Sequence, residues 1–176
     1  MDRQAGRLAR GDRAAFAELY DACADRVHRY LVVRLGSRAD ADDVLQETFV
    51  NLARAAEKLA AVENLEAYVF ASARNEAIRL VERRAREGRL RASPLAEAQF
   101  REAADADLEG RERAEWVATM LARLDPEGRE VVELKIYSGL TFREIAEVTG
   151  LPQGTVATRY RSALETMRGR MAKERE

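Results

Sequence analysis

The sequence predicts an all-α protein of two small helical domains joined by a flexible linker. Apolar residues recur at three- and four-residue steps through most of the 176 residues, which is the pattern of amphipathic helices. Only three prolines occur, and no stretch of strand length alternates polar and apolar residues. The helical periodicity weakens between Gly88 and about Gly110. Residues 1–88 and 113–176 are therefore predicted as separate domains, with residues 89–112 as the linker.

Three helices are expected in the first domain, each with a recognisable end. The first runs from about Asp12 to Leu35 and stops at Gly36, since glycine readily adopts the left-handed backbone of a helix C-cap. The second begins near Asp40, whose carboxylate can accept from free N–H groups, and the third runs from Leu65 to about Arg86 behind the cap Asn64. The apolar stripe of the first helix consists of Phe16, Leu19, Tyr20, Cys23, Val27, Tyr30 and Leu31.

The second domain is predicted to end in a helix-turn-helix, preceded by a helix that starts at Asp125-Pro126. Thr141 and Glu144 have capping-box spacing, and Gly150 permits the tight turn before the second helix of the motif. That helix starts between Pro152 and Thr155. Its expected buried stripe is Val156, Tyr160, Ala163, Leu164 and Met167, which leaves Gln153, Thr155, Thr158, Arg159, Arg161 and Ser162 pointing outward. These exposed residue types can read or hold DNA.

The net charge of −1 conceals one acidic and two basic segments. Residues 40–47 contain four acids and no base, whereas residues 73–91 contain seven arginines against three acids. Residues 155–173 contain five basic residues against Glu165 alone. Local positive charge of this kind is what binding to nucleic-acid phosphates requires. The charge distribution therefore favours DNA binding by the two basic segments and a different binding partner for the acidic segment.

Several function classes are disfavoured by what the sequence lacks. No apolar run approaches the roughly 20 residues of a membrane span, and the charged N-terminus does not resemble a signal peptide, so a soluble, cytoplasmic protein is expected. Cys23 is the only cysteine and is predicted to pack in the core. His28 is the only histidine, and no metal-bundle spacing or phosphate-binding glycine loop is present. We therefore expect no enzyme activity, no metal and no cofactor.

Taken together, these motifs resemble those of an extracytoplasmic-function (group IV) RNA polymerase sigma factor, and the resemblance covers nearly the whole chain. Gly11-Asp12 with Leu19-Tyr20 is similar to the opening helix of the family's domain two, and the segment Asp40 to Phe49 is similar to its Asp-Ala-Glu-Asp-Leu-Val-Gln-Glu-Thr-Phe pattern. In the family this block binds the β′ coiled coil of the polymerase. The resemblance thus assigns core-polymerase binding to Asp42, Asp43, Gln46, Glu47 and Phe49.

Two further blocks resemble the family's promoter-binding segments. Ala73-Arg74-Asn75 and the arginines that follow resemble the part of domain two that faces the minus-ten element, which implies roles for Asn64, Tyr68, Arg74, Asn75, Arg79, Arg83 and Arg84. Tyr68 also lies on the apolar stripe and is expected to be largely core. The helix-turn-helix resembles domain four, which reads the minus-thirty-five element and binds the β flap. This implies roles for Arg143, Gln153, Thr155, Thr158, Arg159, Arg161 and Ser162.

The chain departs from the family pattern at three positions. Arg79 stands where the family often has Asp, Glu82 where it often has Arg, and Ala157 where its Lys-Ser-Arg segment has the lysine. The last change predicts weaker or altered minus-thirty-five binding, carried more by Arg159 and Arg161. An anti-sigma factor is a further potential partner that the sequence does not decide. The alternative to a sigma factor is a stand-alone helix-turn-helix regulator that binds a palindromic site without polymerase.

Overall fold

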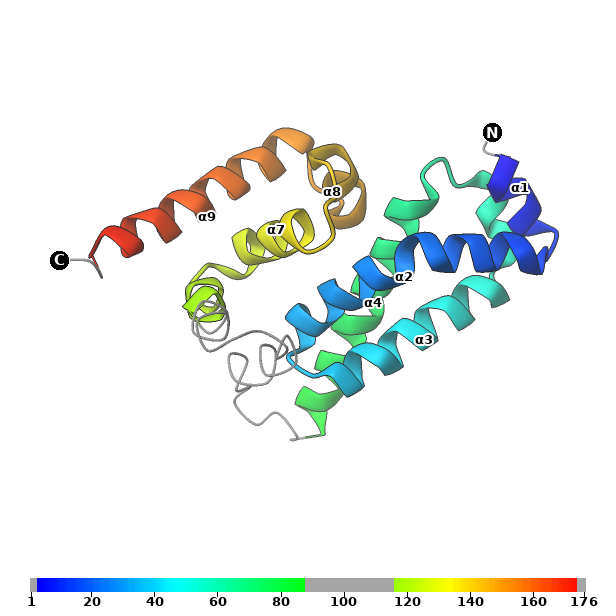
Figure 1. The fold of residues 1–176 in the computed structure, drawn as a ribbon, viewed down its shortest axis with the longest axis horizontal. Helices are drawn as coiled ribbons and strands as arrows, with labels where there is room; N and C mark the ends of the chain where they lie inside the picture. The colour runs from blue at the N-terminus through cyan, green and yellow to red at the C-terminus, as the bar shows by residue number, and fades with distance from the viewer. Residues whose placement is uncertain (1–2, 88–115, 174–176) are drawn as a thin grey trace.

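The computed structural model describes residues 3–87 and 116–173, and every regular element in these two ranges is helical (Figure 1). The predicted linker, residues 89–112, lies outside the described residues. The first range contains α1 (Arg3–Ala9), α2 (Arg13–Leu35), α3 (Arg38–Arg54), the 3-10 helix η1 (Ala56–Ala61) and α4 (Leu65–Arg86). The second contains a helical segment at residues 116–122, then α7 (Pro126–Ile136), α8 (Phe142–Thr149) and α9 (Gln153–Lys173). The prediction of an all-α protein with two helical domains is confirmed.

The helix ends follow the predicted capping residues with one exception. Asp12 caps α2, Gly36 ends it with a φ of 69°, and the Asn64 side chain accepts from the first turn of α4. The prediction that Asp40 caps the second helix is wrong, because Ser37 is the N-cap of α3 and its hydroxyl accepts from the Asp40 N–H. A serine placed three residues earlier already satisfies that donor, which frees the Asp40 carboxylate for another partner.

Two short elements at one end of the first domain were not predicted. The break in periodicity was expected at residues 60–64, but the chain leaves α3 earlier and forms η1. The helix α1 packs against η1, with Ala5 and Leu8 fully buried. They are only seven and six residues long, too short to show a repeated three- and four-residue apolar spacing in the sequence.

The three long helices α2, α3 and α4 pack against one another and bury the predicted apolar stripes. Cys23 is 3% exposed, as expected of a core cysteine, and burial raises the pKa of its thiol to about 11. Tyr20 is the exception on the α2 stripe, since 45% of it is exposed. It lines a groove between α2 and α3, where its ring meets that of Phe49.

The two domains share one continuous hydrophobic core, a feature that the sequence did not predict. Residues of α7, α8 and α9 belong to the same buried cluster as Tyr30, Phe70 and Ala73 of the first domain. The helix α8 lies against α4, and α7 lies against α2, whereas the far end of α9 projects away from the body (Figure 1). The members of the second domain in this cluster are Val131, Leu134, Leu140, Ile145, Val148 and Val156. We call this packed state the closed arrangement.

The helix-turn-helix forms as its sequence signals indicate. Thr141 and Glu144 make both bonds of a capping box at the start of α8, and Gly150 ends that helix with a φ of 72°. The second helix of the motif, α9, begins at Gln153. In its stripe Val156 and Ala163 are buried, and the larger side chains are half-buried. Across the described residues, none of the helices combines the length and the hydropathy that a membrane span requires.

Candidate protein and nucleic-acid interfaces

The predicted polymerase-binding residues form an acidic face on the first half of α3. Asp42, Asp43, Gln46 and Glu47 are all exposed, and their spacing places them within less than half of the helix circumference. The Asp42 carboxylate also contacts α2, because it lies 2.8 Å from Nε2 of His28. The acidic face is therefore held against α2 and presented to solvent.

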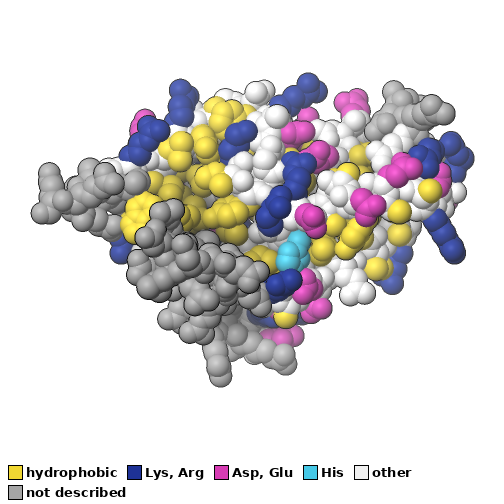
Figure 2. Space-filling model, viewed as in Figure 1, with side chains coloured by type: hydrophobic (Ala, Val, Ile, Leu, Met, Phe, Trp, Pro, Cys, Tyr) yellow, Lys and Arg dark blue, Asp and Glu magenta, His cyan; other side chains and the backbone are white. Residues whose placement is uncertain are grey.

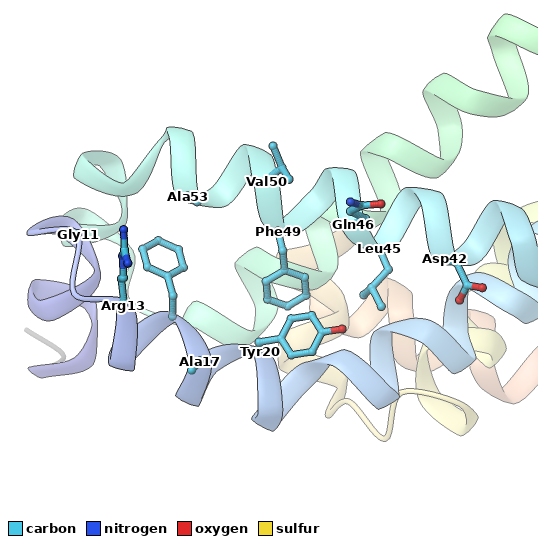
Figure 3. A pocket seen from close by; sticks show the side chains of 11 residues that line it. Gly11, Arg13, Ala17, Tyr20, Asp42, Leu45, Gln46, Phe49, Val50 and Ala53 are labelled. Carbon is cyan, nitrogen blue, oxygen red and sulfur yellow. The ribbon is translucent and has the colours of Figure 1, made fainter.

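Beside this face, α2 and α3 enclose an apolar groove of about 810 Å³. The rings of Tyr20 and Phe49 meet edge to face across it, with centroids 4.8 Å apart (Figure 3). Asp42 and Gln46 stand at one end of the groove and Arg13 at the other (Figure 3). Figure 2 shows exposed hydrophobic side chains next to acidic ones on the face that carries these two helices. Such a surface suits a helical partner with an apolar stripe and basic flanks.

The predicted minus-ten residues do not share one face of α4. Asn75, Arg79 and Arg83 are exposed, and Tyr68 is half-buried on the same side. Arg79 bonds Glu76 one turn away, with Nη1 2.7 Å from Oε1. The remaining two arginines of the set, Arg74 and Arg84, turn toward different neighbouring helices.

Arg84 turns toward α3 and pairs with Asp40. Its Nη1 and Nη2 each lie 2.5 Å from one of the two Asp40 carboxylate oxygens. The Asp40 side chain is 11% exposed, whereas that of Arg84 is 40% exposed. Because a buried carboxylate needs a partner, this pair joins the start of α3 to the end of α4. The pair occupies donors of Arg84 that the sequence analysis assigned to promoter DNA.

Arg74 turns toward the second domain and pairs with Glu130 of α7. Its Nε and Nη2 donate to the two carboxylate oxygens of Glu130, each at 2.9 Å. Arg34 of α2 lies 3.3 Å from Glu130 and 3.4 Å from Glu133, and Glu133 also accepts from Arg129 at 2.5 Å. Both acidic side chains are at most 10% exposed. We call these residues, Arg34, Arg74, Arg129, Glu130 and Glu133, the interdomain charge network.

Other polar contacts also cross between the domains. Nε of Arg26 on α2 donates to the backbone oxygen of Ser138 at 2.7 Å, and Nη2 of the same arginine donates to the same oxygen. Beneath the charge network, Tyr30 is fully buried, and its hydroxyl has no hydrogen-bond partner among the described residues. The acidic half of this interface was not predicted from the sequence. Nothing in the sequence distinguishes Glu130 and Glu133 from exposed helix residues. Only their burial and their pairing with arginines of the first domain show that they belong to the interface.

The predicted minus-thirty-five residues gather on the exposed side of α9, with Arg143 exposed on α8. Gln153, Thr158, Arg161 and Ser162 are exposed, and Thr155 is half-buried. Arg159 departs from the expected outward orientation, because it pairs with Glu127 of α7 at 2.5 Å and its side chain is only 26% exposed. The remaining face is continuous, and Ala157 lies on it between Gln153 and Arg161.

Comparisons with known proteins agree with this architecture. Residues 19–87 match the Sigma-70 region 2 family, and residues 114–167 match the Sigma-70 region 4 family. The chain is 30% identical over 168 residues to the ECF RNA polymerase sigma factor BldN of Streptomyces coelicolor, covering 92% of this chain and 62% of BldN. It is 27% identical over 176 residues to the ECF sigma factor SigK of Mycobacterium tuberculosis, covering 96% of this chain and 91% of SigK.

Solved structures share the fold over both domains. CnrH, solved in complex with the cytosolic domain of CnrY, matches with a TM-score of 0.71 at 22% identity over 97% of this chain and 96% of CnrH. The sigma factor RpoE of Bartonella quintana, solved with the anti-sigma factor NepR, gives 0.63 at 18% identity over 89% of this chain and 94% of RpoE. With both regions matched in order and relatives of the same class along nearly its whole length, the chain belongs to the sigma-70 family of RNA polymerase sigma factors, among those of extracytoplasmic-function type.

Proposed function

We propose that this chain binds core RNA polymerase in the cytoplasm and directs it to promoters, acting as a group IV sigma factor. The observation that carries the proposal is the separation of an acidic face on α3 from the exposed polar and basic face on α9. A regulator that acts without polymerase has no use for the first surface. No catalytic step is part of this role.

The polymerase-binding half of the proposal rests on the acidic face and the groove beside it. Asp42, Asp43, Gln46 and Glu47 supply negative potential, and Phe49 with Tyr20 supplies apolar contact. Charge complementarity of this kind steers association and excludes like-charged partners. A basic coiled coil such as that of the β′ subunit, which the family resemblance implies, fits both properties. The β flap is the corresponding partner proposed for the second domain.

The promoter-binding half rests on two surfaces of different character. The exposed side of α9 carries Gln153, Thr158, Arg161 and Ser162, which suit the major groove of duplex minus-thirty-five DNA. On α4, Asn75, Arg79 and Arg83 are exposed to receive an opened minus-ten strand. Each surface offers few contacts, so holding both on one polymerase raises the effective affinity by linkage.

Association with core polymerase tests the first half. We expect the purified chain to bind core enzyme, and Glu47→Arg to weaken binding at least about tenfold, because it opposes a basic partner with like charge. The matched control is Glu57→Arg, which makes the same change at an exposed position of η1 outside the proposed surface. If the unaltered chain does not bind core enzyme even at low ionic strength, the proposal is wrong.

Transcription from a library of genomic fragments tests the second half. Core polymerase supplemented with the chain is expected to initiate at a limited set of sites that core polymerase alone does not use. Mapping the starts then gives the promoter sequence. Core binding without any sequence-selective start would contradict the promoter-directing role.

A further inference from the structure

Another pocket lies in the first domain, where the end of α1, the end of α3 and the start of η1 meet. Its volume is about 390 Å³, and it is lined by residues 9–11 and 53–58. Three of its four charged side chains are basic, namely Arg10, Arg54 and Lys58, and the fourth is Glu57. All four residues are exposed. We call this positively charged, solvent-accessible site the basic pocket.

The three cations of the basic pocket have no acidic partner among the described residues. No ion pair joins Arg10, Arg54 or Lys58 to a described carboxylate, although Glu57 lines the same pocket. Arg54 lies in the last turn of α3, where a cation complements the partial negative charge of the helix end. Helix stability thus accounts for one of the three charges, but it does not explain why three gather around one pocket.

The packing of short elements holds the basic pocket in shape. Leu8 of α1 and Leu59 of η1 are fully buried, and these two elements pack against each other. Nε of Arg7 donates to the carboxylate of Asp12, the N-cap of α2, at 2.7 Å, which joins the end of α1 to the start of α2. Arg7 is therefore engaged within the fold, whereas Arg10 lines the pocket. The segments that carry the three cations are fixed without any contribution from those cations.

A phosphate group has the charge and the acceptors that the basic pocket requires. Cations that gather without acidic partners repel one another, and an anion between them relieves that repulsion. Arginine donates to phosphate oxygens through a planar fork, and lysine donates to them as a compact charge. Among the described residues that line the pocket, none has an aromatic ring on which a base could stack. The pocket is therefore suited to a phosphate and not to a base.

The place of the basic pocket in the chain favours DNA as the source of that phosphate. Residues 56–58 of the pocket belong to η1, and the connection after η1 runs to Asn64 at the start of α4 (Figure 1). The exposed side chains proposed to receive the opened minus-ten strand follow on α4, and they are Asn75, Arg79 and Arg83. A strand that lies along α4 and continues past its first turn reaches η1.

We propose that Arg10, Arg54 and Lys58 bind a backbone phosphate of single-stranded promoter DNA, next to the segment that α4 engages. This inference rests on the proposed function, because it adds a contact to the same opened strand. Phosphate contacts give affinity and register, but they do not discriminate among bases. The basic pocket thus strengthens binding of the opened strand without changing which sequence is selected.

Nuclear magnetic resonance titration of the isotope-labelled full chain tests this proposal in the absence of polymerase. The probe is a short oligothymidylate, which is expected to shift the amide signals of residues 9–11 and 53–58. Inorganic phosphate and an oligoglutamate of equal charge are titrated for comparison. We expect both to shift these signals only at concentrations at least about tenfold higher, because neither contacts α4 and the pocket together as a DNA strand does.

Charge variants then identify the side chains that contact the strand. Arg54→Gln is expected to weaken binding of the oligothymidylate and to reduce the slope of log affinity against log salt concentration by about 0.7, the value for one phosphate contact on a single strand. Combining it with Lys58→Gln should weaken binding about tenfold at low ionic strength. The matched control Arg29→Gln removes an exposed arginine from the middle of α2 and is expected to change the affinity by less than about twofold. Glu57→Gln should tighten binding, a gain that partial unfolding cannot imitate.

Four results would overturn the proposal. The oligothymidylate leaves the signals of the basic pocket unshifted, or Arg29→Gln weakens its binding as much as Arg54→Gln does. Inorganic phosphate shifts the signals at the same concentration, which indicates a simple anion site, or the oligoglutamate does so, which indicates an acidic protein partner. All of these measurements use the chain alone, so their outcome is distinguishable from a failure to bind core polymerase or to direct it to start sites.

Discussion

Removing the hydroxyl of Tyr30 is expected to stabilise the protein. The Tyr30 side chain is fully buried, and its hydroxyl has no partner among the described residues. The ring itself packs edge to face against Phe70, with centroids 6.3 Å apart, and Tyr30→Phe preserves that contact. A buried polar group without a hydrogen bond costs about 1–3 kcal/mol, so the substitution should raise the free energy of unfolding by about 1 kcal/mol or more.

Urea denaturation followed by far-UV circular dichroism measures this change, with the gain appearing as a higher midpoint at an unchanged m-value. For a chain of this length, 1 kcal/mol also corresponds to a rise in melting temperature of about 2–4 °C. The matched control is Tyr20→Phe, because that hydroxyl belongs to a ring that is 45% exposed, and its removal should be neutral. Destabilisation by Tyr30→Phe would show that the hydroxyl is satisfied and would refute the reasoning.

Three other predictions follow from the described contacts. Arg84→Ala should lower the free energy of unfolding, measured by chemical denaturation, by about 1–3 kcal/mol, because it leaves the buried Asp40 carboxylate unpaired. The control Arg83→Ala removes an exposed arginine and should lower it by less than about 0.5 kcal/mol. Equal losses for the two variants would contradict the role of the pair. Burial raises the pKa of Glu144, but the hydrogen bonds that Thr141 donates to its carboxylate act in the opposite direction and prevail, so the net pKa lies below the ordinary value. Its carboxylate therefore stabilises the fold above pH 4.5, and this contribution is lost as pH falls through the folded pKa, so the melting temperatures of the unaltered chain and Glu144→Gln should converge in acid. Ala157→Lys should strengthen promoter binding by the polymerase complex and steepen its dependence on salt by about one phosphate contact, and no gain would count against a DNA contact at this position.

The sequence predicted the helices and their ends well, because these depend on interactions among near neighbours. The cap at Asn64, the C-cap at Gly36 and the capping box of Thr141 with Glu144 all form as predicted. Each is a bond between residues at most four positions apart. Even the one wrong cap, Asp40 in place of Ser37, is an error of three residues within the same turn.

The candidate site was predicted less completely, since exposure of a charged side chain depends on what faces it. Arg74, Arg84 and Arg159 look alike in sequence, and each was assigned to DNA. In the structure each is paired with an acid that is distant in sequence and lies on another helix. Arg74 and Arg159 pair with acids of α7, and Arg84 pairs with an acid of α3. Helical periodicity gives the direction of a side chain, but it does not identify the partner on a neighbouring helix.

The sequence by itself determined the helical class, the order of the two domains and the chemistry of their exposed segments, because periodicity, caps and charge are local properties of the chain. Only the tertiary structure decided that the domains share a core and that Glu130 engages Arg74. These residues are 56 positions apart. Such contacts arise from the way whole helices pack, and no short-range pattern records which face of one helix meets another.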